Sequence, residues 1–284
     1  MGSYMTAVPP VRQLAVLGLL FGLSWAGSAA AQTPSPFPFW QDAAGIVLTP
    51  MAGPVPEWRA TLGGGAAAIP LYEGADHYKI VPSPAFDLRY SDIAFLSSGD
   101  GLGVNLLRGD TYRAGIAIAY DVGRNAHISG RLNGLGNVGA APEAKLFGEV
   151  AILPFILSAD LRRAIGGHDG VIGDLGFYLP VVGNEKLVVF LGPSVSFAND
   201  RYMQSYFGIG TAQAAGSTAG FPVYTAKGGV KNAGFGVTCI YHFAPKWFLD
   251  ADLGFERLAD SAGNSPIVQD RNQLGVSLVA GYEF

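Results

Sequence analysis

Along most of this chain, apolar residues alternate with small or polar ones, and they seldom form long runs. Residues 273–284 show the pattern best, because every second side chain from Leu274 to Phe284 is apolar or aromatic. Such alternation is typical of a strand with one face in an apolar environment. A membrane helix needs about 20 consecutive apolar residues, and only residues 14–25 approach that length. The sequence therefore predicts strands.

The composition favours strands in lipid over strands in water. The chain is 49% hydrophobic and 14% charged, and its mean hydropathy is +0.28, whereas a soluble domain carries about 25% charged residues. Because lipid offers no water to an open sheet edge, membrane strands must close into a barrel. We expect an all-β fold, a closed antiparallel transmembrane β-barrel with apolar residues facing lipid and polar residues facing the lumen.

The alternation recurs in about twelve segments, an even number as in bacterial single-chain barrels. In residues 112–121, Tyr112 and Tyr120 bracket an apolar band, as the aromatic girdles at the two membrane interfaces require. The other clear strands are residues 235–243, 247–255 and 273–284. Weaker ones are predicted at about residues 59–69, 80–90, 93–97, 102–107, 144–153, 155–165, 171–182 and 187–198.

The N-terminus has the order of a secretory signal peptide. Arg12 precedes an apolar run and then small residues, which predicts a signal over residues 1–31 with cleavage after Ala31. An anchoring helix is the alternative, but the apolar core is short for a span. Residues 32–58 are rich in proline, which disrupts strand pairing. We therefore expect a Pro-rich segment and then a barrel over residues 59–284, exported to the outer membrane of a Gram-negative cell.

One connection, residues 199–231, shows no sustained alternation of apolar and polar residues. Loops this long are usually functional or disordered, and the aromatic residues here argue against disorder. Two interpretations are open: the loop constricts the lumen or binds a partner, or it is tied down by Arg201 and packed through its aromatic side chains. The candidate residues are Asp200, Arg201, Tyr202, Gln204, Tyr206 and Phe207.

Charged residues fall on the polar side of the predicted strands. They could select a solute by charge, or they could form arginine–carboxylate networks that fill a narrow interior, since buried charges need partners. The set is Asp87, Arg89, Arg113, Asp121, Lys145, Glu149, Asp160, Arg162, Asp174, Asp250, Asp252 and Glu256.

Several functions lack support in the sequence. A net charge of −4 without a basic run argues against nucleic-acid binding, and the single cysteine, Cys239, is expected to face lipid. No GxSxG elbow accompanies the inward-facing Ser194, Ser196 and His242, so no catalytic residue is predicted. The four histidines, His77, His127, His168 and His242, show no metal-ligand spacing, so no metal or cofactor is predicted.

The loop motif DRYMQSYFGI (residues 200–209), with TAQAAGS at 211–217, resembles the signature region of the MipA/OmpV family of outer-membrane proteins. Residues 70–90, 112–124 and 257–268 contain further matching blocks, so the resemblance covers about residues 59–284. MipA stands for MltA-interacting protein, and the namesake is regarded as a scaffold that joins a lytic transglycosylase to a murein synthase. The family has no catalytic motif to transfer.

We expect a monomeric barrel. The resemblance implies an outer-membrane adaptor for a murein hydrolase and a murein synthase, and we expect its periplasmic turns and residues 33–58 to make the partner contacts. The alternatives are a narrow solute channel or small-molecule-binding barrel and, third, a lipid-active enzyme. The expected surroundings are outer-membrane lipid and the barrel-assembly machinery. Tyr282 and Phe284 close the last strand as the signal that such machinery reads.

Overall fold

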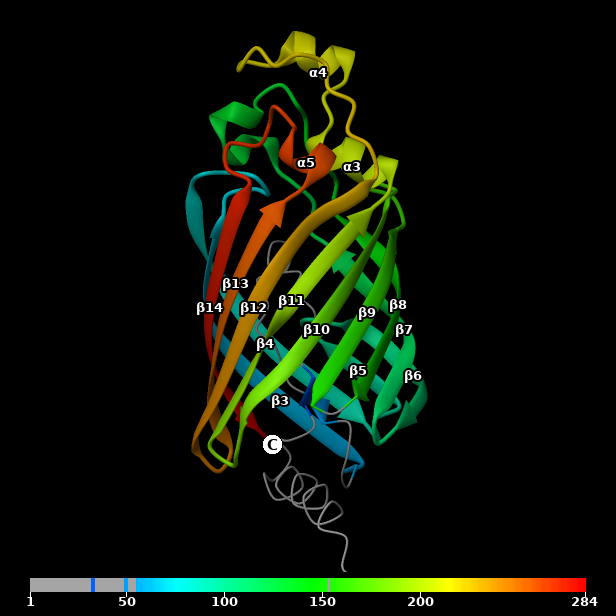
Figure 1. Cartoon of the computed structure of the whole chain (residues 1–284), viewed down its shortest axis with the longest axis vertical. Coiled ribbons are helices and arrows are strands. Elements are labelled where there is room, and N and C mark those ends of the chain that lie inside the picture. The colour runs from blue at the N-terminus through cyan, green and yellow to red at the C-terminus, as the bar shows by residue number, and fades with distance from the viewer. Residues whose placement is uncertain (1–31, 34–48, 51–54, 153) are drawn as a thin grey trace, which may run out of the picture.

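A computed structural model describes residues 32–33, 49–50, 55–152 and 154–284. Twelve antiparallel strands, β3 to β14, form a closed barrel in which β3 pairs with both β4 and β14 (Figure 1). The expected barrel is confirmed. Two short strands, β1 (Gln32–Thr33) and β2 (Thr49–Pro50), pair with each other. The predicted signal peptide, residues 1–31, lies outside the described residues.

The barrel strands are β3 (Trp58–Pro70), β4 (Tyr78–Tyr90), β5 (Ala94–Ser97), β6 (Gly101–Gly109), β7 (Tyr112–Asp121), β8 (Ala141–Ile152), β9 (Phe155–Ala164), β10 (Val171–Gly183), β11 (Leu187–Ala198), β12 (Gly229–Ala244), β13 (Trp247–Leu258) and β14 (Asn272–Glu283).

The alternation in the sequence becomes the two faces of the wall. On β14, Leu278 is 55% exposed on the outside, whereas Ser277 beside it points inward and is 3% exposed. The same period of two continues along the other strands, because successive side chains point to opposite faces of a sheet. The outer surface is therefore an apolar belt, and polar side chains are directed into the barrel.

Aromatic residues border this belt. Near the C-terminus, the ring of Trp58 lies 4.8 Å from that of Tyr90, and the ring of Trp247 lies 4.9 Å from that of Tyr282. At the opposite ends of their strands, Tyr120 and Phe197 are also exposed. Aromatic rings at these two levels match the interfacial girdles of membrane barrels. None of the helices in the described part of the chain has the length and apolarity to cross a bilayer.

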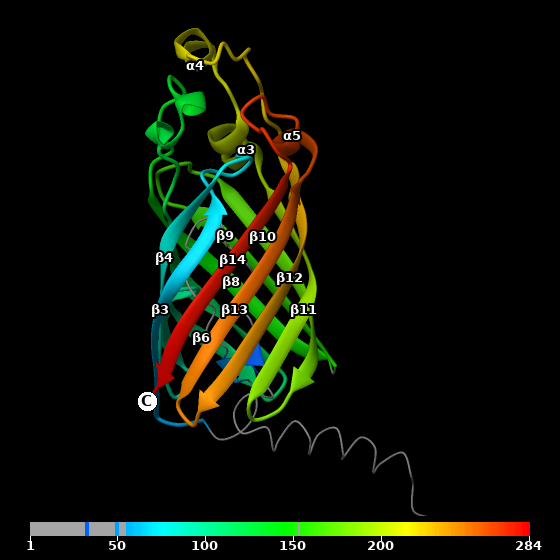
Figure 2. The same ribbon diagram turned by 90° about the vertical axis from the view of Figure 1, so that its left-hand side faces the viewer.

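The two ends of the barrel differ (Figures 1 and 2). One end, here called the turn end, carries the C-terminus and short connections, of which 91–93, 110–111, 184–186 and 245–246 are described throughout. The other end, here called the mouth, carries the long connections. These are residues 71–77, 122–140, 165–170, 199–228 and 259–271, together with the short turn 98–100.

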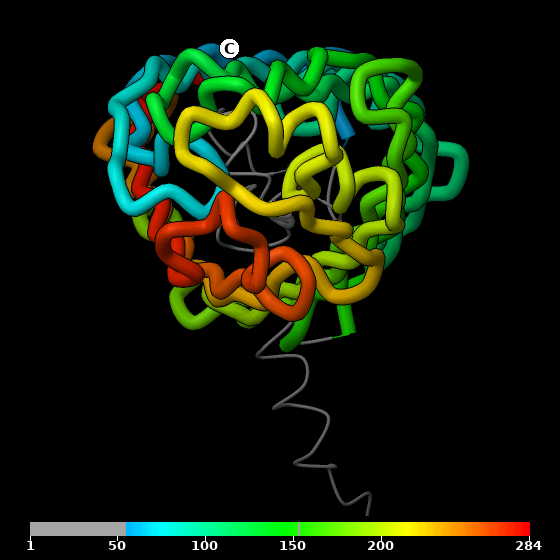
Figure 3. Tube along the Cα trace, turned by 90° about the horizontal axis from the view of Figure 1, so that it is seen from above, coloured from blue at the N-terminus to red at the C-terminus, as the bar shows by residue number. Residues whose placement is uncertain are grey.

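The long connections are folded rather than extended, and seen from above they cross the mouth (Figure 3). The segment predicted as one loop, residues 199–231, contains two helices, and β12 begins at Gly229 rather than near residue 235. Asn199 caps the first of these helices, because its side chain accepts the Tyr202 N–H at 3.0 Å. The mouth helices are α3 (Asp200–Phe207), α4 (Thr211–Gly216), α5 (Asp260–Gly263) and the 3₁₀ turns η1 (Ala126–Ile128) and η2 (Gly130–Leu132).

Candidate functional site

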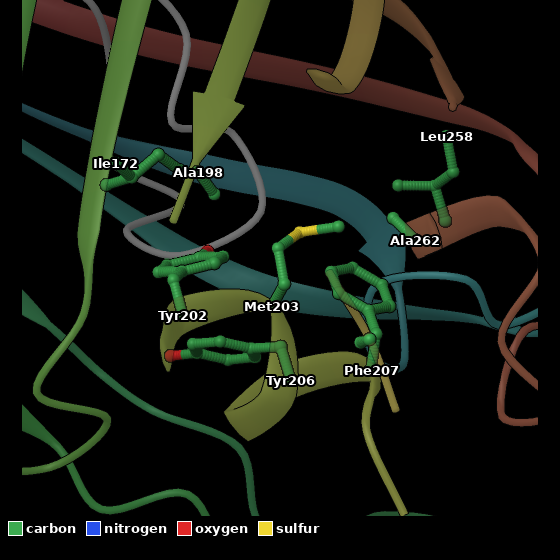
Figure 4. Close-up of a cluster of buried hydrophobic side chains, with 9 residues drawn as sticks. Ile172, Ala198, Tyr202, Met203, Tyr206, Phe207, Leu258 and Ala262 are labelled. Carbon is green, nitrogen blue, oxygen red and sulfur yellow. The ribbon is translucent and has the colours of Figure 1, made fainter. Parts of the chain in front are cut away.

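Helix α3 lies in the mouth and buries one face against the ends of the strands (Figure 4). Tyr202, Met203 and Phe207 are each 0% exposed, so one face of this eight-residue helix is completely covered. A face this apolar needs partners from other elements. They are Ile172 of β10, Ala198 of β11, Ala226, Leu258 of β13 and Ala262 of α5.

A second apolar cluster joins the three longest connections to one another. Leu132 and Leu135 come from residues 122–140, Ile209 and Phe221 from 199–228, and Ile267 from 259–271. Leu132, Ile209 and Ile267 are all 0% exposed. The mouth therefore has a hydrophobic core of its own, built entirely outside the strands.

Polar contacts fix α3 in the same position. The Tyr206 hydroxyl donates to both carboxylate oxygens of Asp121, at 2.7 and 2.8 Å. The Arg124 guanidinium donates to the Tyr206 carbonyl, and the Ser265 hydroxyl donates to the Phe207 carbonyl at 2.5 Å. Burial raises the pKa of Tyr206, which keeps the hydroxyl protonated as a donor.

The six candidate residues of the loop have different surroundings. Tyr202, Tyr206 and Phe207 are buried in the cluster around α3. The Gln204 side-chain oxygen accepts the Ala226 N–H at 3.0 Å, and Asp200 accepts the Gly228 N–H at 2.6 Å. Arg201 is exposed and pairs with Asp169 at 2.7 Å; an exposed pair contributes little to stability. All six thus contact other parts of the mouth, and only Asp200 and Arg201 are also exposed to solvent.

The inward-facing charges form paired networks. Arg162 lies 3.0 Å from Asp160 and 3.6 Å from Glu143, and it also pairs with Asp174. Toward the turn end, Arg113 pairs with Glu149 at 2.7 Å. The remaining pairs are Arg89 with Asp87 and Asp100, Lys145 with Asp100, Arg113 with Asp92, and Lys231 with Glu73.

These inward-facing side chains are buried as well as paired. Arg89 and Arg113 are each 4% exposed and Arg162 is 6% exposed. Charges this far from water need partners, because the cost of desolvating each ion is several kcal/mol. The networks meet that need.

One inward pair of carboxylates differs. Asp252 accepts the Thr238 and Ser277 hydroxyls, each at 2.8 Å. Asp250 is 0% exposed, and neither of its oxygens has a hydrogen-bond partner among the described residues. No described basic side chain is paired with either carboxylate. The inner wall therefore carries two acidic side chains without a described basic partner at this level.

A second group of acids meets a histidine at the mouth. His168, in the connection 165–170, has its Nε2 atom 3.1 Å from Asp121 Oδ2 and 3.4 Å from Glu143 Oε1. All three side chains are buried, and one ligand-type atom from each lies within 4.8 Å of the others. Sequence spacing gave no sign of this grouping, because the three residues come from β7, β8 and the β9–β10 connection.

The surroundings act on His168 in opposing ways. Burial lowers the pKa of the imidazole, while the carboxylates of Asp121 and Glu143 raise it, to about 9 overall. The rings of Tyr202 and Tyr206 lie 4.9 and 5.6 Å from the imidazole. The other ring nitrogen, Nδ1, accepts the Gly170 N–H at 3.0 Å. His168 is thus held from three sides.

The inward-facing serines and His242 do not meet. The Ser196 hydroxyl donates to Asp174, and Ser194 is paired across the sheet with Gly234, near the mouth end of β12. His242 lies at the turn end of β12, where its Nε2 atom is 3.7 Å from Glu283. The geometry therefore does not assemble a nucleophile with a base from these residues.

Comparison with known proteins gives one clear match. The model of a family described as "MltA-interacting protein MipA" matches residues 62–284. No curated protein sequence matches the chain.

Solved barrels are similar at low identity. The NanC porin is 8% identical, with a TM-score of 0.40, and the match covers 78% of this chain and 98% of that one. The outer-membrane channel DcaP of Acinetobacter baumannii is 12% identical, with a TM-score of 0.35, covering 80% and 96%. Likenesses at these values say nothing about activity.

Proposed function

The chain belongs to the MipA family, and on that premise we propose that it is a non-enzymatic adaptor that holds murein-remodelling enzymes at the outer membrane. The family description names an interaction with MltA. The sequence resemblance adds the chemistry of the partners, a lytic transglycosylase and a murein synthase.

The packed mouth and the paired inward-facing charges are the observations that carry this proposal. Charged side chains inside the barrel are buried and paired, and the mouth has an apolar core that includes α3. A protein that works as a passage needs a path through its interior, whereas an adaptor needs only its outer surfaces. The arrangement favours the adaptor.

The proposed location follows from the outer surface. An apolar belt between two levels of aromatic residues suits a bilayer, and the predicted signal peptide would export the chain. Outer-membrane barrels have short periplasmic turns and longer extracellular loops. On this rule the turn end lies in the periplasm, on the side of the murein, and the mouth faces outward.

Two neighbouring turns offer charge for a partner. Glu185 and Lys186 are exposed between β10 and β11, and Lys246 is exposed between β12 and β13. The turns are adjacent, because the His242 N–H at the end of β12 donates to the Lys186 carbonyl at 2.7 Å. This surface is available to a periplasmic protein without any change in the barrel.

A capture experiment tests the adaptor proposal. The folded protein in detergent is immobilised and incubated with purified exported lytic transglycosylase and murein synthase. We expect stoichiometric capture of at least one enzyme, reduced at least tenfold by the combined substitutions Glu185→Ala, Lys186→Ala and Lys246→Ala. Arg201→Ala with Lys227→Ala removes exposed charge at the mouth and serves as the matched control. Failure to capture either enzyme, or loss of capture only in the control, would contradict the proposal.

A narrow channel is the second candidate, favoured by the inward-facing acidic side chains of Asp250 and Asp252, which have no basic partner among the described residues. If α3 and its surroundings block a cation path, deletion of residues 203–226 should create conductance that wild type lacks in planar bilayers. Absence of conductance in both proteins would remove this candidate.

A further inference from the structure

The group at the mouth formed by Asp121, Glu143 and His168 has the composition of a metal site. It combines one imidazole with two carboxylates, which are the ligand types of divalent transition metals. Three separate parts of the barrel supply them: the last residue of β7, the start of β8 and the β9–β10 connection. All three side chains are 0–1% exposed, so the three groups already lie together away from bulk solvent.

Three polar atoms in this group lack hydrogen-bond partners in the described part of the chain. Glu143 Oε1 and Oε2 and His168 Nε2 have no hydrogen-bond partner among the described residues, although all three atoms are buried. Buried polar atoms are nearly always satisfied in folded proteins. Glu143 does lie 3.6 Å from Arg162, but that guanidinium also pairs with Asp160 and Asp174. Arg162 is therefore shared among three carboxylates, and Glu143 is the most distant of them.

We propose that Asp121, Glu143 and His168 bind a divalent transition-metal ion of the Zn²⁺ type. The ion would lie among Asp121 Oδ2, Glu143 Oε1 and His168 Nε2, the atoms that already converge within 4.8 Å. The ion would add positive charge beside Glu143, where Arg162 is shared with two other carboxylates. It would also be a common partner for Glu143 Oε1 and His168 Nε2, which have no hydrogen-bond partner among the described residues.

A proton on His168 Nε2 is the competing occupant. A single N–H can point at only one carboxylate at a time, and Nε2 is 3.1 Å from Asp121 and 3.4 Å from Glu143. A proton shared with Asp121 leaves Glu143 with the Arg162 guanidinium at 3.6 Å as its nearest paired cation. A metal ion satisfies all three ligands together, which is the reason to prefer it.

Metal binding has a consequence for the neighbouring turn. A neutral imidazole that ligates through Nε2 carries its proton on Nδ1, where it now accepts the Gly170 N–H at 3.0 Å. The Gly170 amide must therefore turn away when the metal binds. Gly166 and Gly167 precede it with φ of +89° and +60°, conformations that glycine adopts without strain, and they give the turn the freedom to adjust.

The site would also strengthen the hold on α3. Asp121 accepts the Tyr206 hydroxyl at 2.7 and 2.8 Å, and the His168 carbonyl accepts the Ser205 hydroxyl at 3.3 Å. A metal ion that fixes Asp121 and His168 fixes two of the contacts of this helix. It would act as a clamp on the mouth.

The test uses the folded mature chain in detergent, with any affinity tag removed and Cys239→Ser as background. Zn²⁺ and Co²⁺ are titrated and followed by calorimetry and by the visible absorption of bound Co²⁺, with Mg²⁺ as the hard-cation comparison. We expect one equivalent of Zn²⁺ or Co²⁺ and no response to Mg²⁺. Glu143→Gln and His168→Gln should each weaken binding at least tenfold, whereas His77→Gln, which removes an exposed histidine next to Asp76, should not.

Binding of less than one equivalent by wild type, or equal binding by all variants, would overturn the proposal. If the variants fail to fold, a crystal of wild type soaked in Zn²⁺ decides through anomalous scattering. A peak among Asp121, Glu143 and His168 supports the site. A peak only elsewhere, or no peak, overturns it.

Discussion

The two ends of the barrel are built on different principles. At the mouth, connections far apart in sequence share apolar clusters, buried ion pairs and the group around His168. At the turn end, the described connections are two or three residues long, and most of their side chains are exposed. The difference indicates that the mouth is held by tertiary packing, while the turns depend on the strands they join.

Removal of a buried charge from the interior near the mouth should have the largest effect. Arg162→Met leaves Glu143, Asp160 and Asp174 without their shared cation, and we expect a loss of about 4 kcal/mol in the free energy of unfolding. Arg163→Met, on the outward face of the next position, should change it by less than about 1 kcal/mol. Urea unfolding in lipid vesicles measures both. Equal effects would contradict the view of a packed interior.

Loss of an aromatic side chain from α3 should come next. Phe207→Ala removes a fully buried ring, at a cost of about 3 kcal/mol. The loss should be local, so that a protease cuts within residues 199–228 while the barrel keeps its heat-modifiable mobility on gels. Phe255→Ala on the lipid face is the control. Resistance of the Phe207→Ala loop to protease would show that the mouth does not depend on this packing.

The hydroxyl of Tyr206 should have a smaller effect. Tyr206→Phe keeps the ring but deprives the buried Asp121 of a donor, and hydrogen bonds to charged groups are worth about 2 kcal/mol. Tyr120→Phe, at an exposed outer position, should be neutral. Thermal unfolding of both variants provides the comparison. An unchanged unfolding temperature for Tyr206→Phe would show that the hydrogen bond to Asp121 does not stabilise the mouth.

The smallest predicted effect concerns an asparagine side chain that accepts backbone N–H groups, which occurs at both ends of the barrel. Asn199→Ala removes the cap of α3 and should cost about 1 kcal/mol. At the turn end, Asn184 accepts the Lys186 and Leu187 N–H groups, both at 3.0 Å, and solvent can replace it. Asn184→Ala should therefore cost less. A larger loss from Asn184→Ala in the same urea assay would reverse the comparison.

Most strands of the barrel could be predicted because each one shows its own alternation of apolar and polar residues. Residues 112–121 were predicted from alternation alone and are the bounds of β7. The start of β12 was missed, because the glycines at 229 and 234 interrupt the apolar alternation there. A period of two is visible within one strand, so the wall could be predicted one strand at a time.

The mouth could not be predicted in this way. Helix α3 has eight residues, which is too few for a helical period to stand out, and its buried face is set by β10, β11 and β13. His168 meets Asp121 and Glu143 only because β7, β8 and β9 are neighbours in the closed barrel. No spacing along the chain encodes that neighbourhood.

The orientation of the two ends is the central claim, and surface labelling tests it most directly. Single cysteines are introduced in a Cys239→Ser background, Ala215→Cys in α4 at the mouth and Glu185→Cys at the turn end. Intact cells are then treated with a membrane-impermeant maleimide. We predict that the cysteine at 215 is labelled at once and the cysteine at 185 only after the outer membrane is permeabilised. Labelling of position 185 on intact cells, with 215 protected, would contradict the account.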